Sequence, residues 1–159
     1  MNPQEYEILL VEDDPADAEL TVLSLRKARL ANRIEVARDG AEALDYLFCR
    51  GAFASRSFDH PPRLVLLDLK LPRVSGHEVL RAIKADECTR SIPVVVLTSS
   101  NQDRDLIECY QLGVNSYIQK PVDLQKFQET VHHFGLYWLV VNHPAPPAAF
   151  TVKTPRRDP

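Results

Sequence analysis

Five residues of this sequence carry side chains that together could handle a phosphoryl group. They comprise three carboxylates, a hydroxyl and an ammonium: Glu12, Asp13, Asp68, Thr98 and Lys120. Carboxylates that lie close together repel one another and need a cation, and oxygen ligands with open water positions favour Mg²⁺. A metal ion, an ammonium and a hydroxyl could jointly stabilise phosphoryl oxygens, with Asp68 as the nucleophile. This chemistry requires residues that are far apart in the sequence to converge.

Each of these residues stands at or just after the end of a segment that predicts a strand. Unbroken apolar runs such as Leu64–Leu67 are typical of strands that helices cover on both faces. The expected strands are Tyr6–Val11, Ile34–Ala37, Leu64–Leu67, Val94–Leu97 and Val114–Gln119. The expected helices are Pro15–Arg29, Asp39–Arg50, Ser75–Ala85, Gln102–Leu112 and Asp123–Val141. We expect Asp39 to cap its helix, Gly113 to end one, and Gly135 to mark a kink.

This alternation of strands and helices predicts an α/β fold with a doubly wound parallel sheet. Right-handed crossovers place helices on both faces, and the working site of such a fold lies beyond the carboxyl ends of its central strands. The candidate residues should therefore meet in one crevice. Taken singly, each has an ordinary structural role, because an aspartate after a strand usually caps a turn or helix. Their occurrence together at four strand ends favours the functional interpretation.

The composition is that of an ordinary soluble domain. The chain has 159 residues, 45% of them hydrophobic, and its net charge of −3 is too small to imply a nucleic-acid or membrane partner. Its longest apolar run, Leu136–Val141, is far shorter than the about 20 residues that span a bilayer. Three isolated cysteines and the lack of a signal-peptide pattern favour the cytoplasm. We expect one domain over residues 5–141 and a Pro-rich, extended or disordered arm over 142–159.

Four motifs resemble those of a response-regulator receiver domain, over residues from about 5 to 134. The motifs are Ile8–Asp13, Leu66–Pro72, Val96–Ser99 and Tyr117–Pro121. The resemblance implies a flavodoxin-like fold with a five-stranded parallel sheet in the order 2-1-3-4-5. It also implies that Asp68 accepts a phosphoryl group from a histidine kinase, within a two-component phosphorelay.

The resemblance assigns roles to the other site residues. Mg²⁺ would be bound by Asp13, Asp68 and the backbone carbonyl of Lys70, with Glu12 acting through water. Thr98 and Lys120 would contact the phosphoryl oxygens, and Tyr117 would be the switch aromatic. The bond between Lys120 and Pro121 would be cis.

Softer motifs resemble one branch of this family, the single-domain regulators that pair with phytochrome-type light-sensing histidine kinases. These motifs are Asp39–Leu44, the long loop Gly51–Pro62, Leu112–Tyr117 and Gly135–Leu139.

Some positions depart from the family pattern. Glu12 replaces the first aspartate of an acidic pair, and a further carboxylate, Asp14, follows that pair. Lys70 and Ser100 each stand two places after a site residue, flanking the path of the hydrolytic water. The five histidines show no ligand spacing and are interpreted as surface or packing residues.

Two functions from different classes fit the site residues. The first is a signalling switch that is not an enzyme and acts through protein–protein contacts. The second is a Mg²⁺-dependent aspartyl-phosphate phosphatase of haloacid-dehalogenase type, whose second aspartate, an acid/base, would stand where this chain has Lys70. The missing proton donor favours the switch.

The last predicted helix suggests a homodimer. Apolar residues between Leu124 and Val141 recur at helical spacing and form one face that packs on the core. In the last turns, the other faces of the helix are also apolar, with Leu136, Tyr137, Leu139 and Val140. We expect a two-fold dimer through the fourth-helix, fifth-strand, fifth-helix face and the C-terminal extension. The alternative is that the Pro-rich arm folds back over these side chains.

Overall fold

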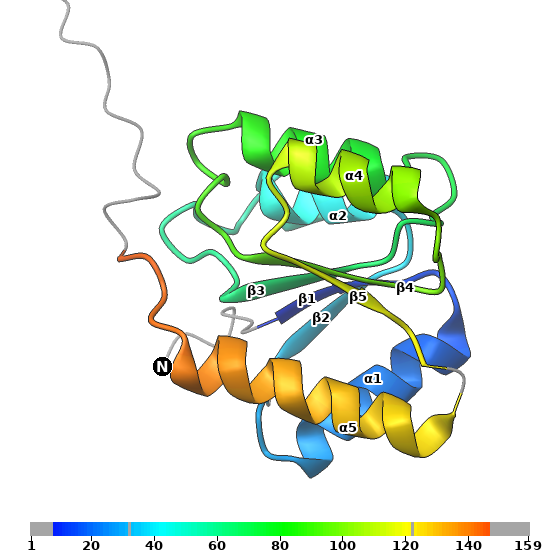
Figure 1. The fold of residues 1–159 in the computed structure, drawn as a ribbon. Helices are drawn as coiled ribbons and strands as arrows, with labels where there is room; N and C mark the ends of the chain where they lie inside the picture. Colours follow the sequence, from blue (N-terminus) through cyan, green and yellow to red (C-terminus); the bar gives the residue numbers. More distant parts are fainter. Residues whose placement is uncertain (1–7, 32, 122, 147–159) are drawn as a thin grey trace, which may run out of the picture.

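The computed structural model describes residues 8–31, 33–121 and 123–146, which form one parallel sheet between two layers of helices (Figure 1). The strands pair in the order β2-β1-β3-β4-β5. They are β1 (Ile8–Val11), β2 (Ile34–Ala37), β3 (Leu64–Leu67), β4 (Val94–Thr98) and β5 (Ser116–Gln119). The predicted doubly wound α/β fold and sheet order are confirmed.

Helices α2, α3 and α4 cover one face of the sheet, and α1 and α5 cover the other (Figure 1). Their bounds are α1 (Pro15–Lys27), α2 (Gly40–Leu47), α3 (Gly76–Ala85), α4 (Asp103–Leu112) and α5 (Leu124–Leu136). Two short helices complete the fold: the 3₁₀-helix η1 (Gly51–Phe53) and the π-helix η2 (Tyr137–Val141). No helix among the described residues is both long and apolar enough to cross a bilayer.

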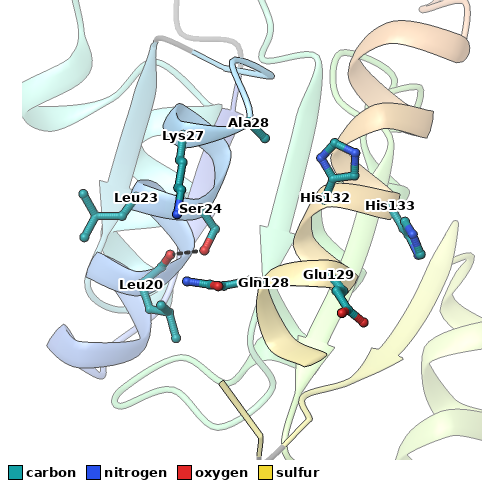
Figure 2. Close-up of a pocket in the computed structure, with 9 residues that line it drawn as sticks. All are labelled: Leu20, Leu23, Ser24, Lys27, Ala28, Gln128, Glu129, His132 and His133. Atoms are coloured by element: carbon teal, nitrogen blue, oxygen red, sulfur yellow. Dashed lines mark hydrogen bonds between the residues drawn. The ribbon is translucent and has the colours of Figure 1, made fainter. Parts of the chain in front are cut away.

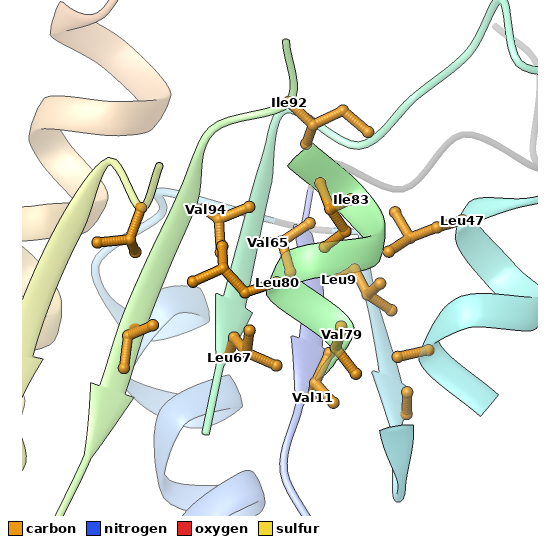
Figure 3. Close-up of a cluster of buried hydrophobic side chains, with 14 of the residues drawn as sticks. Leu9, Val11, Leu47, Val65, Leu67, Val79, Leu80, Ile83, Ile92 and Val94 are labelled. Atoms are coloured by element: carbon orange, nitrogen blue, oxygen red, sulfur yellow. The ribbon is translucent and has the colours of Figure 1, made fainter. Parts of the chain in front are cut away.

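The central strands are apolar along their whole length because successive side chains enter two different cores. In β3, Val65 and Leu67 pack against the α2–α4 side, where α3 contributes three buried residues: Val79, Leu80 and Ile83 (Figure 3). Leu64 and Leu66 point the other way, into a cluster with residues of α1 and α5. Two-sided burial therefore fixes the sheet whose carboxyl edge carries the candidate residues.

Three helix ends follow the sequence signals. Asp39 caps α2 by accepting a hydrogen bond from the backbone N–H of Glu42 at 2.8 Å. Ser75 and Glu78 form a reciprocal capping box at the start of α3. Gly113 ends α4 in the left-handed conformation, with φ of 95°.

Two helices are shorter than expected. Helix α1 ends at Lys27 instead of Arg29, because Arg29 takes the left-handed conformation with φ of 55°. Helix α2 ends at Leu47 instead of Arg50, since Cys49 does the same with φ of 54°. Left-handed backbone cannot continue a right-handed helix, so the chain turns away from the helix axis at both residues.

Gly135, where a kink was expected, does not interrupt helix α5. Helix α5 runs through this residue to Leu136, and a Cβ at position 135 would lie 2.7 Å from Cδ1 of Leu30. The glycine thus lets α5 approach the end of α1. Beyond it the expected helix continues to Val141 with π-helical geometry.

Helices α1 and α5 leave an open groove between them, away from the carboxyl edge of the sheet (Figure 2). It is lined by Leu20, Leu23, Ser24, Lys27, Ala28, Gln128, Glu129, His132 and His133. None of the predicted site residues lies in it.

The arm expected over residues 142–159 is described as far as residue 146. This part contains no helix or strand, and Ala145 packs against the core on the α2–α4 side. It leaves Tyr137, Val140 and Val141 at least half exposed. The boundary between domain and arm stays a prediction.

Candidate functional site

The structure brings the five predicted residues together at the carboxyl edge of the sheet. Backbone hydrogen bonds continue the strand ladder past its last paired residues, because Asp68 N–H donates to the carbonyl of Val11 at 3.1 Å. Similarly, Lys120 N–H donates to the carbonyl of Thr98 at 2.7 Å. These bonds hold the site residues at the ends of rigid strands, so their relative positions are set by the sheet.

Asp68 is buried, and both of its carboxylate oxygens have donors. The Thr98 hydroxyl donates to Oδ1 at 3.1 Å, and the backbone N–H of Lys70 donates to the same oxygen at 3.2 Å. The Lys120 ammonium donates to Oδ2 at 3.1 Å. The carboxylate is thereby oriented, with the hydroxyl and the ammonium already at its oxygens.

Lys120 joins three carboxylates. Its Nζ lies 2.5 Å from Oε2 of Glu12, 3.0 Å from Oδ2 of Asp17 and 3.1 Å from Oδ2 of Asp68. Burial alone lowers the pKa of Lys120, but the hydrogen bond to Glu12 and the charges of Asp68 and Glu12 outweigh it, so the pKa is raised. Lys120 is therefore a permanent cation in this site.

Asp17 is the member of this group that sequence reasoning missed. It belongs to the first turn of α1, where an acidic residue is ordinarily explained by the helix dipole. Its contact with Lys120 joins residues 103 positions apart. The only sequence signal for Asp17 was its position three residues after Asp14, the residue that caps α1 and so marks where its first turn begins.

Asp14 is a helix cap and not a further ligand. Its Oδ1 accepts hydrogen bonds from the backbone N–H groups of Ala16 at 2.8 Å and Asp17 at 3.0 Å. This is the ordinary role of an aspartate before a helix that begins with proline.

Three carboxylates could hold a metal ion. Ligand oxygens of Glu12, Asp13 and Asp68 all lie within 4.8 Å of one another. Asp13 is exposed, whereas Glu12 and Asp68 are buried. A hard, all-oxygen set with one side open to water fits Mg²⁺ or a similar divalent ion.

Burial changes the acidity of Glu12. It raises the pKa of this carboxyl to about 7, the charge of Asp68 acts in the same direction, and Lys120 opposes both. Near neutral pH, Glu12 is thus the site carboxylate that a cation would help to ionise.

The expected switch residues flank the loop after β4, because Thr98 ends β4 and Tyr117 lies in β5. Ser100 is buried, and its hydroxyl donates to Oδ2 of Asp105 in α4 at 2.5 Å. The Tyr117 hydroxyl donates to the backbone carbonyl of Ser100 at 3.2 Å, and burial raises the pKa of Tyr117. Tyr117 therefore already lies against the loop that follows Thr98.

The cis bond implied for Lys120 and Pro121 is wrong. Among the described residues every peptide bond is trans, which is also the preferred form for a residue before proline.

Glycine at position 76 sets how closely α3 approaches the site. A Cβ there would lie 2.3 Å from the carbonyl oxygen of Asp68 and 2.5 Å from Cα of Leu69. Any other residue would displace the backbone of the site, so the first residue of α3 is part of the site's construction.

Comparison with known proteins agrees with this geometry. The sequence profile of the response regulator receiver domain matches residues 8–132. The probable methanogenesis regulatory protein FilR2 of Methanothrix harundinacea is 48% identical over 141 residues, which cover 89% of this chain and 88% of FilR2. Response regulator Rcp1 of Synechocystis is 38% identical over 132 residues, covering 83% of this chain and 88% of Rcp1.

Two solved structures share the fold closely. The phosphorylated cyanobacterial phytochrome response regulator RcpA has a TM-score of 0.82 and 38% identity, covering 88% of this chain and 98% of RcpA. The Mn²⁺-bound form of Rcp1 also has a TM-score of 0.82, with 36% identity over 88% of this chain and 99% of Rcp1.

Proposed function

Because the chain belongs to the response-regulator receiver family, we propose that it is a switch whose Asp68 accepts a phosphoryl group from a histidine kinase. Receiver domains of this type are signalling proteins and not enzymes. The observation that carries the assignment to Asp68 is its pair of oriented oxygens, one beside Thr98 and the other beside Lys120.

The geometry suggests how the transfer proceeds. A carboxylate oxygen of Asp68 forms a bond to phosphorus, the bond between phosphorus and the kinase imidazole nitrogen breaks, and that nitrogen keeps the electron pair. The Thr98 hydroxyl and the Lys120 ammonium, now at the carboxylate, would move to the new phosphoryl oxygens. Both donors are in place before the reaction, so little reorganisation is needed.

A divalent cation completes the proposed site. Glu12, Asp13 and Asp68 would hold it, together with the backbone carbonyl of Lys70, and we expect Mg²⁺ in this role. When bound, the ion supplies positive charge to the transferred phosphoryl oxygens. The Mn²⁺-bound form of the relative Rcp1 supports a divalent metal in this chain as well.

The alternative function is an aspartyl-phosphate phosphatase, which uses the same residue types. A kinetic assay distinguishes it from the switch. With p-nitrophenyl phosphate and Mg²⁺, many turnovers per chain would support a phosphatase. We expect no sustained turnover, because the phosphatase's acid/base aspartate would stand at position 70, and this chain has an exposed lysine there.

Phosphorylation should act through the loop after β4. A dianionic group at Asp68 would draw the Thr98 hydroxyl, and Tyr117 is bonded to the same loop. Beryllofluoride, which mimics the phosphoryl group, should shift NMR signals of α4 and β5. Shifts confined to the neighbours of Asp68 would contradict this switch.

We also propose that the partner is a phytochrome-type kinase, supported by the likeness to the cyanobacterial phytochrome response regulator RcpA over most of both chains. Phosphotransfer from an autophosphorylated phytochrome kinase should be at least about tenfold faster than from a kinase with an unrelated sensor. Equal rates would contradict the pairing but not the role of Asp68.

A cytoplasmic location stays a prediction.

We propose a homodimer through the α4–β5–α5 face and η2. Several large apolar side chains are exposed there: Ile107, Tyr110, Leu124, Leu136, Tyr137, Val140 and Val141. Exposed apolar side chains on these elements favour burial against a second copy of the chain.

Sedimentation tests the dimer directly. The full chain should be dimeric at micromolar concentration, and Val140→Asp should make it monomeric because Val140 is 63% exposed. The matched control is Leu23→Asp on α1, which is 55% exposed but lies on the groove between α1 and α5. A wild-type monomer, with and without beryllofluoride, would contradict the proposal.

A further inference from the structure

Lys84 and Lys120 are both partly buried, but their surroundings differ in charge. Lys120 lies among three carboxylates, which keep it cationic. Lys84 on α3 instead donates three hydrogen bonds, to the backbone carbonyls of Arg90 at 3.1 Å and Ile92 at 3.0 Å and to Oδ1 of Asn115 at 3.0 Å. These partners of its ammonium in the described part of the chain are all uncharged oxygens.

The neutral surroundings leave the effect of burial on Lys84 unopposed. Burial lowers the pKa of this ammonium to about 8. Carbonyl oxygens accept hydrogen bonds, but they carry no full negative charge that would offset the lost hydration. At pH 8 about half of Lys84 is therefore a neutral amine, against under about 1% of an exposed lysine. Only the neutral amine has a free electron pair, so Lys84 has the nucleophilic form that exposed lysines lack.

Lys84 lies at the amino edge of the sheet, opposite to the edge that carries Asp68. Its acceptors on Arg90 and Asn115 belong to exposed residues, so the ammonium lies near the surface. The Asn115 side chain also accepts a hydrogen bond from the backbone N–H of Val94 at 2.8 Å. Lys84 thereby joins α3 to the residues that begin β4 and precede β5. Half-burial leaves room for a small donor rather than for the active site of an acylating enzyme.

We propose that Lys84 is a site of N-acylation by acyl phosphates, and that acylation loosens the loop between α3 and β4. The amine nitrogen forms a bond to the carbonyl carbon of the donor, and the bond from that carbon to the phosphate oxygen breaks. Phosphate leaves with the electron pair and takes one proton from the nitrogen. Phosphorylation of Asp68 by the same donor would break a different bond, the one from phosphorus to the acyl oxygen. Acylation of Lys84 is therefore independent of the proposed function.

Acylation removes two of the three donors of this side chain. An amide nitrogen carries one N–H, so acylated Lys84 can serve only one of its acceptors. The loop over residues 86–92 then depends on its own turns, in which the backbone N–H of Arg90 donates to the carbonyl of Asp86 at 2.9 Å and that of Ile92 to the carbonyl of Thr89 at 3.0 Å. With fewer bonds to α3, these turns should open more often.

Acetyl phosphate is the probe for the modification. Peptide mapping by mass spectrometry should follow acetylation at each lysine of the full wild-type chain at pH 8. Lys84 should be acetylated about tenfold faster than Lys126, an exposed lysine on α5, because its larger amine fraction outweighs the lower reactivity of a weaker base. Acetylation of Lys84 no faster than that of Lys126 overturns the proposal.

Hydrogen exchange tests the effect on the loop. Lys84→Gln removes the ammonium, and the backbone amides of Arg90 and Ile92 should then exchange at least about fivefold faster than in wild type. Lys84→Arg keeps several donors and should retain most of the protection. The matched control is Lys126→Gln, which should exchange as the wild type does. Unchanged exchange of the two amides in Lys84→Gln overturns the proposed loosening.

Discussion

Replacing Gly76 with alanine should damage both stability and phosphorylation. The new Cβ would lie 2.3 Å from the carbonyl oxygen of Asp68, and restoring even a 3.0 Å separation requires a movement of about 0.7 Å. The atoms in the way are backbone, so no flexible side chain can yield. Overpacking of this kind costs about 1–3 kcal/mol, against a gain in helix propensity of at most about 1 kcal/mol. We therefore expect a net loss of about 1–2 kcal/mol.

Urea denaturation measures this loss. With a slope of about 2 kcal/mol per molar urea, the midpoint of unfolding of Gly76→Ala should fall by about 0.5–1 M. The rate of phosphorylation by acetyl phosphate should fall as well, because a shift of about 1 Å near reacting atoms can cost about a hundredfold in rate.

Gly113→Ala is the matched control. Its φ of 95° makes alanine unfavourable by about 1–2 kcal/mol, although its Cβ would meet only the Lys84 side chain, at 3.7 Å. It should lose similar stability but keep the wild-type rate of phosphorylation. Wild-type stability in Gly76→Ala, or equal loss of phosphorylation in both variants, would refute this reasoning.

Two further predictions concern the charged group at the site. Burial raises the pKa of Glu12 to about 7, and Mg²⁺ favours the ionised carboxylate, so metal binding should release a proton and Mg²⁺ affinity should rise between pH 6 and pH 8. Calorimetry should show a weaker dependence of Mg²⁺ affinity on pH for Glu12→Gln, and an unchanged dependence would contradict the role of Glu12. Lys120→Met removes the cation shared by Glu12, Asp17 and Asp68. The variant should destabilise the metal-free protein by about 3–5 kcal/mol, a loss that proton uptake by the carboxylates reduces, and it should bind Mg²⁺ more tightly than the wild type. Thermal unfolding with EDTA or with Mg²⁺ measures both effects. A melting temperature of the variant that does not respond to Mg²⁺ would contradict the arrangement.

The sequence predicted the sheet well because the central strands are constrained on both faces. Residues of β3 such as Leu66 and Leu67 enter opposite cores, so the run must be apolar throughout, and its bounds are confirmed. The convergence of Asp68, Thr98 and Lys120 followed from the parallel topology alone.

What the sequence did not predict depends on contacts between elements. Asp17 joins the site only because the first turn of α1 passes beside Lys120. His77 lacks any ligand spacing, since its partners lie on the neighbouring helix α4. The early ends of α1 and α2 depend on left-handed residues that are not glycine, Arg29 and Cys49, and such residues carry no clear sequence signal.

The most direct test of the central claim is to locate the phosphoryl group. Incubation with acetyl phosphate and Mg²⁺ should add the mass of one phosphoryl group, and peptide mapping should place it on Asp68. Asp68→Asn should abolish the label, whereas Asp14→Asn should retain it, because asparagine caps a helix as well as aspartate and Asp14 only caps α1. Labelling that persists in Asp68→Asn, or that maps to another carboxylate in the wild type, would contradict the account.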